Sequence, residues 1–305
     1  MMKRLILISF ILSTIISCEK IITFEGEDIV PKLVINSIFE SDSVFKVHVS
    51  NSKSIVGNGS ITNIIDASVL IKNTNGIVID SLTYQNNGFY IGQQYPVQNT
   101  TYKLEVNHPN YNSVNSSDEI PDSISINYID TNTVLTNGFD ELEERIELTI
   151  SFDDPIGIQN FYLVESYITG PFRYMYDFDT TWSSYDTTLQ VEMILTDEVF
   201  QNNGNPKQNS GIFNDLLFNG QTKLLNLEID KQNEVYADGK EIIIKTENIK
   251  FYLHNISQDY YYYLTSLELY NDRSGNPFAQ PVQVFSNIEN GFGIFAGAQI
   301  SKMEL

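Results

Sequence analysis

Basic residues, histidine and cysteine are all scarce in this chain of 305 residues. Its 18 Lys and Arg oppose 39 Asp and Glu, which gives a formal net charge of −21. Nucleic-acid binding needs a basic surface that displaces counterions from phosphates, so the composition argues against that function. A single cysteine cannot form an intrachain disulfide, and three histidines leave few ligands for a zinc site of the Cys/His type.

Sequence signatures of catalysis are also missing. His48, His108 and His254 stand apart, and the chain has no His-Glu-x-x-His motif, no Gly-x-Ser-x-Gly turn and no glycine-rich phosphate loop. Carboxylates such as Asp153-Asp154 are expected in solvated turns, because none has the spacing of a calcium loop; a calcium site is the alternative. We therefore expect no enzyme activity, no metal and no cofactor. A glycan-active hydrolase with two acids from distant strands is an alternative.

What the chain does contain is apolar and aromatic. Apolar residues make up 42% and charged residues 19%, with 18 Tyr and 18 Phe. This composition is typical of a folded protein rather than a disordered one. The length predicts about two domains.

The N-terminus has the parts of a secretory signal. Lys3-Arg4 precedes an apolar stretch over residues 5–16, which is too short to span a bilayer stably. The stretch ends at Ile15-Ile16-Ser17-Cys18, which resembles the bacterial lipobox and holds the only cysteine. We expect residues 1–17 to be removed and Cys18 to carry a lipid that anchors the mature protein to a membrane. A plain signal peptide is the alternative.

Strand patterns begin after a polar, acidic tether over residues 18–31. Apolar residues alternate over 44–49, 67–71 and 101–106. Asn75-Gly76 and Asn87-Gly88 tolerate positive φ and predict tight hairpins. Strands about ten residues apart predict an Ig-like or transthyretin-like sandwich over residues 32–120.

Residues 121–305 predict a larger antiparallel β domain with one helix. The helix is expected over residues 258–270, with Ser257 as its N-cap and apolar residues at helical spacing from Tyr260 to Leu267. The tyrosines 260–263 within it are expected to pack against the fold. Residues 282–285 and 293–298 are expected to form closing strands. The fold is therefore predicted to be all-β with a single helix.

Three glycines mark the last predicted strand. Gly291, Gly293 and Gly297 would permit close backbone approach or positive φ, so this segment predicts a structural corner. A docking edge for a partner barrel is the alternative.

The densest aromatic stretch, residues 167–185, is the candidate binding surface. Rigid aromatic rings with polar tips suit stacking on a sugar or gripping a peptide. The alternation of these residues favours a hairpin with one buried aromatic face over a binding surface, and the ligand, whether small nutrient, peptide or glycan, is open. The candidate ligand-binding residues are Tyr174, Tyr176, Trp182 and Tyr185.

Three C-terminal stretches resemble the closing signature of a Bacteroidota lipoprotein family catalogued only as a domain of unknown function, DUF4249. They are residues 257–264, 276–282 and 286–297; the stretches 66–69, 87–90, 152–155 and 213–220 are similar to it as well. The resemblance covers nearly the whole mature chain.

This resemblance implies an outer-membrane lipoprotein associated with a TonB-dependent transporter, with no catalytic residues to carry over. We therefore expect a cell-surface protein, held by the lipid on Cys18, that assists nutrient capture or uptake. A structural or adhesive envelope protein is the alternative.

Overall fold

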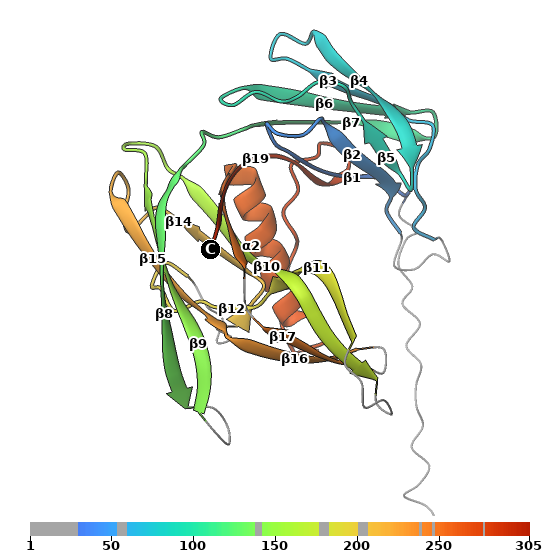
Figure 1. The fold of residues 1–305 in the computed structure, drawn as a ribbon. Coiled ribbons are helices and arrows are strands. Elements are labelled where there is room, and N and C mark those ends of the chain that lie inside the picture. Colours follow the sequence, from blue (N-terminus) through green and yellow to red (C-terminus); the bar gives the residue numbers. More distant parts are fainter. Residues whose placement is uncertain are drawn as a thin grey trace, which may run out of the picture.

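A computed structural model describes residues 30–53, 60–137, 142–176, 183–200, 207–237, 240–245, 248–276 and 278–305. These residues form a 14-stranded sheet and a 5-stranded sheet, both rich in antiparallel pairs, with one α-helix (Figure 1). The predicted all-β fold with one helix is confirmed. No helix in the described part of the chain is long and apolar enough to cross a membrane.

The described N-terminal strands surround one apolar core. Alternate residues of these strands point inward, as the sequence pattern predicts. Val78–Leu82 of β4 pairs with β3, and Thr83–Asn86 pairs with β5, so the sheet folds over itself. The strands are β1 (Leu33–Phe39), β2 (Lys46–Asn51), β3 (Ser68–Lys72), β4 (Val78–Asn86), β5 (Phe89–Ile91), β6 (Thr101–His108) and β7 (Tyr111–Glu119).

The two predicted hairpin turns in this region are confirmed. Gly76, between β3 and β4, has φ 81°, and Asn87 and Gly88, between β4 and β5, have φ 47° and 82°. Residues that tolerate the left-handed region stand where the chain reverses.

The C-terminal strands form two layers that pack face to face (Figure 1). The 5-stranded sheet has the order β13-β12-β15-β9-β8 and covers one face of the larger sheet. The strands are β8 (Ile126–Asn137), β9 (Leu142–Asp153), β10 (Phe161–Tyr176), β11 (Ser183–Val191), β12 (Met193–Ile194), β13 (Lys207–Gln208), β14 (Ser210–Asn214), β15 (Thr222–Asp230), β16 (Gln232–Ala237), β17 (Lys240–Lys245) and β18 (Ile249–Ile256).

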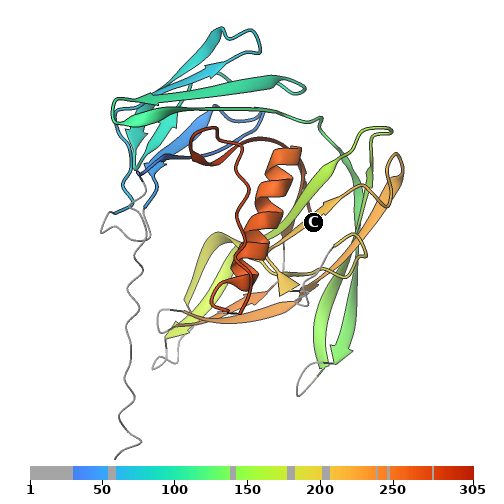
Figure 2. The ribbon, with the colours of Figure 1, turned by 180° about the vertical axis from the view of Figure 1, so that it is seen from behind.

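Strand β10 is buried on both faces at its start. Tyr162 and Val164 belong to the core between the two layers, whereas Phe161 and Leu163 lie on the opposite face. That opposite face is covered by the helix, α2 (Gln258–Arg273), as Figure 2 shows from behind. The helix therefore forms a third layer on the large sheet.

The start of α2 is where the sequence places it. Ser257 is the N-cap, and its Oγ accepts a hydrogen bond from the Tyr260 N–H at 3.2 Å. The predicted strand over residues 282–285 is wrong. Residues 278–291 instead return alongside α2 (Figure 2), where the Phe285 N–H donates to Ser266 Oγ at 2.8 Å. The alternating apolar residues over 282–285 therefore pair with no strand among the described residues.

The last strand, β19 (Phe292–Glu304), belongs to both halves of the molecule. Its first residues pair parallel with β1, from Val34–Phe292 to Phe39–Gly297, and its later residues pair antiparallel with β18. A Cβ on Gly293 would lie 1.8 Å from the Ile35 carbonyl oxygen, and one on Gly297 would lie 2.1 Å from that of Glu119. The predicted structural corner is confirmed, and it is where the C-terminal strand closes against the N-terminal strands.

Candidate functional site

A hollow of about 620 Å³ lies between α2 and the loop that follows β14. We call it the helix groove. Its walls come from the loop, from the exposed side of α2 and from the segment that returns along α2. The residues that define it are Phe213, Leu216, Leu217, Tyr261, Tyr262 and Phe285.

The floor of the groove is aromatic and held in place. The ring of Tyr261 lies 4.7 Å from that of Phe161 on β10, and its hydroxyl accepts a hydrogen bond from Asn214 Nδ2 at 3.2 Å. Phe213 also lines the groove and is fully buried. The contacts with Phe161 and Asn214 fix the orientation of the Tyr261 ring in the groove.

Two leucines stand exposed at the rim. Leu216 is 77% exposed and Leu217 is 60% exposed. The loop that carries them is fixed, since Asn214 Oδ1 accepts from the Leu216 N–H at 3.0 Å and buried Asp215 accepts from the Asn160 N–H at 2.9 Å. A rigid loop that exposes adjacent leucines beside a hollow is typical of a binding surface.

Tyr262 completes the rim from the helix side. It is 43% exposed, its ring lies 5.7 Å from that of Phe285, and its hydroxyl accepts from Gln258 Nε2 at 3.0 Å. An exposed aromatic ring with a fixed orientation offers contact area at little entropic cost.

Two carboxylates border this apolar surface. Glu198 and Glu268 line the groove, and among the described residues that line it none is Lys, Arg or His. Burial raises the pKa of Glu268, a hydrogen bond from Gln208 lowers it, and Asp272 raises it further. The groove therefore suits an apolar or aromatic group that carries no negative charge.

The predicted aromatic surface falls partly within the described residues. Tyr174 and Tyr176 lie in β10 and Tyr185 lies in β11, where the register pairs Tyr174 with Ser183 and Phe172 with Tyr185. Trp182 and Cys18 lie outside the described residues. Backbone pairing thus places Tyr174 and Tyr185 on adjacent strands, and their role in ligand binding stays a prediction.

The helical tyrosine run is partly architectural. Tyr260 and Tyr261 pack on the cluster of Phe161, Leu163 and Ile256, which agrees with the predicted packing role. Tyr262 instead faces the groove. The sequence analysis did not predict Leu216 and Leu217 as binding residues. The available signal was that two adjacent leucines stand between Asn214-Asp215 and Gly220, in a stretch otherwise typical of a turn.

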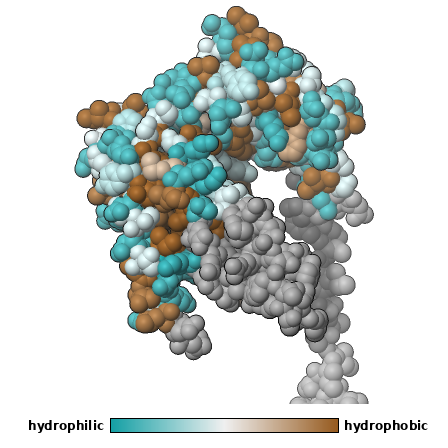
Figure 3. All heavy atoms as spheres, viewed as in Figure 1, coloured by the Kyte–Doolittle hydropathy of each residue, from teal (hydrophilic) through white to brown (hydrophobic). Residues whose placement is uncertain are grey.

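A second exposed apolar patch lies at the end of the β8–β9 hairpin, which projects from the body (Figure 1). Figure 3 shows hydrophobic residues at this end, and Leu135 and Leu142 are both exposed. The residues that follow Leu142 in β9, Glu143 and Glu144, are charged, so the apolar surface does not continue along that strand.

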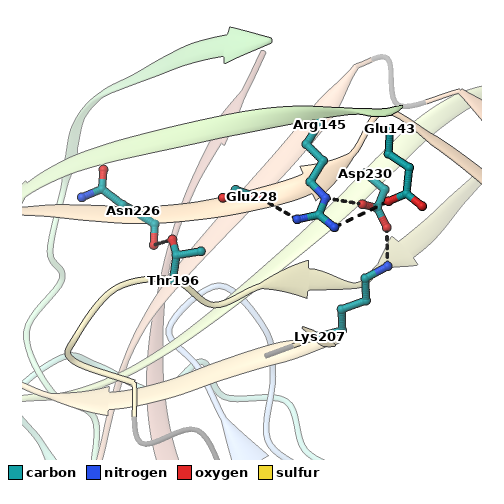
Figure 4. Close-up of polar contacts among 7 residues, drawn as sticks. All are labelled: Glu143, Arg145, Thr196, Lys207, Asn226, Glu228 and Asp230. Carbon is teal, nitrogen blue, oxygen red and sulfur yellow. Dashed lines mark hydrogen bonds and ion pairs between the residues drawn. The ribbon is translucent and has the colours of Figure 1, made fainter. Parts of the chain in front are cut away.

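The cluster around Arg145 on the smaller sheet is ionic (Figure 4). Arg145 Nε donates to Asp230 Oδ1 and Nη1 donates to Glu228 Oε2, both at 3.1 Å, and Nη2 lies 3.6 Å from Glu143 Oε2. Lys207 Nζ donates to the other oxygen of Asp230 at 2.7 Å. The carboxylates pair with both Arg145 and Lys207, so we interpret the cluster as a structural contact that connects β9, β15 and β13.

Arg145→Ala is expected to lower the free energy of unfolding by about 2 kcal/mol, because three carboxylates then face one another without the guanidinium. Lys231→Ala is the matched control: its pair with Glu144, at 2.9 Å, is largely exposed and should matter by less than about 0.5 kcal/mol. Urea unfolding of both variants measures the difference. Equal effects would contradict a structural role specific to Arg145.

Comparison with known proteins places the chain in a sequence family. The family model described as "Domain of unknown function (DUF4249)" matches residues 19–304. No curated protein and no solved structure matches the chain.

Proposed function

The chain belongs to the DUF4249 family, and on that premise we propose that it is a lipid-anchored accessory protein of the bacterial outer membrane. It is non-enzymatic and captures a nutrient for a TonB-dependent transporter. The lipid on Cys18 holds it to the membrane, and its folded part faces the cell exterior.

The observation that supports capture is the helix groove. A volume of about 620 Å³ fits one small ligand or one or two side chains of a peptide. Its rings and its leucine-bearing loop are fixed by contacts to the sheet, so binding costs little ordering. Exposed Leu216 and Leu217 gain contact area when a ligand covers them.

Affinity purification of the lipidated full-length protein from native membranes, after chemical cross-linking, tests the partner. We expect a TonB-dependent transporter in near-stoichiometric amount. Recovery of the protein without a transporter, from cells grown on varied nutrients, would contradict the proposal and favour a structural or adhesive envelope role.

Uptake by cells tests the groove itself. The double change Leu216→Ser and Leu217→Ser is expected to reduce uptake of the transported nutrient about tenfold with little change in melting temperature, because both side chains are exposed. The matched control is Leu135→Ser with Leu142→Ser at the hairpin end, which should leave uptake unchanged. Equal uptake by both double variants would show that the groove does not bind the nutrient.

A further inference from the structure

Two loops beside the helix groove carry four exposed aliphatic side chains. Residues 155–160 lie in the loop between β9 and β10, and residues 216–221 lie in the loop between β14 and β15. Both loops project at the same corner of the molecule (Figure 1, Figure 2), and Figure 3 shows hydrophobic residues there. We call this corner the apolar tip. Its exposed side chains are Ile156 at 84%, Ile158 at 56%, Leu216 at 77% and Leu217 at 60%.

Hydrogen bonds between the two loops hold the tip in shape. The side chain of Asn219 connects them, since its Oδ1 accepts from the Gly157 N–H at 3.2 Å and its Nδ2 donates to the Ile158 carbonyl oxygen at 2.7 Å. A second connection runs from buried Asp154, which accepts from the Gly220 N–H at 2.7 Å. The backbone that exposes the aliphatic side chains is therefore fixed by contacts within the protein.

The tip is uncharged, although the chain is strongly acidic. Residues 155–160 and 216–221 contain no Asp, Glu, Lys, Arg or His, whereas the chain carries a net charge of −21. The adjacent carboxylates, Asp154 and Asp215, are buried. A surface of this kind suits an occupant that is itself uncharged where the two touch.

The kind of side chain favours a lipid surface over a protein partner. Hot spots of protein interfaces are enriched in Trp, Tyr and Arg, whereas Leu is under-represented in them. The two loops contain no Trp, Tyr, Arg or Met, and their one aromatic residue, Phe218, is buried. Aliphatic side chains on a projecting loop gain from contact with hydrocarbon in proportion to the apolar area that leaves water.

The length of the N-terminal segment limits how far the tip can be from a membrane. Residues 18–29 separate Cys18 from the first described residue, Val30, and a segment of this length reaches about 40 Å at most when fully extended. A lipid on Cys18 would therefore confine the folded part to the water next to the bilayer. There the tip meets lipid at a high effective concentration.

We propose that the apolar tip inserts its aliphatic side chains into the interfacial region of a lipid bilayer. This inference rests on the lipid anchor of the proposed function, but not on the transporter or the nutrient. Ile156 and Ile158 form the centre of the contact, because neither lines the helix groove. Leu216 and Leu217 belong to the tip and also line the groove, so insertion brings the mouth of the groove to the membrane surface.

Quenching by lipid in reconstituted vesicles tests the insertion. The lipidated protein with Ile156→Cys carries an environment-sensitive fluorophore on the new thiol, in phosphatidylcholine vesicles that contain a spin-labelled lipid. The matched control is Leu135→Cys at the end of the β8–β9 hairpin, where the native leucine is 64% exposed. We expect the label at position 156 to be quenched severalfold more than the label at position 135. Added salt should not reduce this quenching, because the tip is uncharged.

A double variant locates the contact. With the label on Leu217→Cys, the added changes Ile156→Ser and Ile158→Ser should lower the inserted fraction about tenfold, because two apolar side chains leave the contact. The matched pair Leu135→Ser with Leu142→Ser should leave the quenching unchanged. All four of these native side chains are exposed, so both double variants are expected to fold, and their melting temperatures check this.

Flotation of the vesicles distinguishes a failed anchor from a failed tip. Protein that does not float with the vesicles lacks the lipid assigned to Cys18, which overturns the anchor and this inference with it. Protein that floats while the label at position 156 is quenched no more than the label at position 135 overturns the insertion alone. Quenching that survives Ile156→Ser with Ile158→Ser does the same.

Cross-linking in native membranes tests the choice between lipid and protein. A photoreactive group on Ile156→Cys should capture lipid. Capture of a protein in its place would overturn the proposal and assign the tip to a protein partner.

Discussion

Gly293→Ala is expected to lower the free energy of unfolding by about 4 kcal/mol or more. Gly293 has φ 103°, a backbone conformation that costs a residue with a Cβ about 1–3 kcal/mol. The added carbon would also lie 1.8 Å from the Ile35 carbonyl oxygen on β1. That atom belongs to a paired strand and cannot turn away, so β1 and β19 would have to separate.

Gly275→Ala is the matched control for this change. Gly275 has φ 84°, but a Cβ added there would have no atom within 4 Å. Its cost should be the conformational part alone, about 1–2 kcal/mol. Urea unfolding of both variants isolates the effect of close strand approach. Similar losses of stability would contradict the role assigned to Gly293 in joining the two halves.

The sequence predicts local features of this fold well. Ser257 as a helix N-cap, the Asn87-Gly88 turn and the glycine corner each depend on a few adjacent residues whose backbone preference is strong. The parallel pairing of β1 with β19 could not be predicted in this way. Those strands are far apart in sequence, and an alternating pattern shows which face of a strand is buried but not which strand is its neighbour.

Asp154 shows how tertiary contacts override a turn pattern. The Asp153-Asp154-Pro155 stretch predicts a solvated turn, and β9 does end at Asp153. Asp154, however, is buried and accepts hydrogen bonds from the Tyr162 hydroxyl and from the Gly220 N–H. Both donors come from segments outside the turn, so only the folded chain shows why this carboxylate is buried.

The helix groove depends on tertiary contacts in the same way. Leu216 and Leu217 stand in a stretch whose sequence is typical of a turn, and they become a rim only because Asn214 and Asp215 fix their loop beside α2.

Phe213→Ala is expected to lower the free energy of unfolding by about 3–5 kcal/mol, because it leaves a cavity among aromatic rings that hold the two sheets together. Phe213 lines the groove and is fully buried in the core between the two sheets. Its ring lies between 5.1 and 6.5 Å from four others, those of Phe152, Tyr162, Phe200 and Phe218.

Leu217→Ala separates this structural role from ligand binding at the same place. Leu217 lies on the rim, so its truncation should change stability by less than about 0.5 kcal/mol. Thermal and urea unfolding of both variants measure the contrast. A small loss for Phe213→Ala would mean that the aromatic cluster repacks freely, and a large loss for Leu217→Ala would mean that the rim is part of the core. With the expected result, the groove is a rigid surface on which exposed leucines are free to contact a ligand.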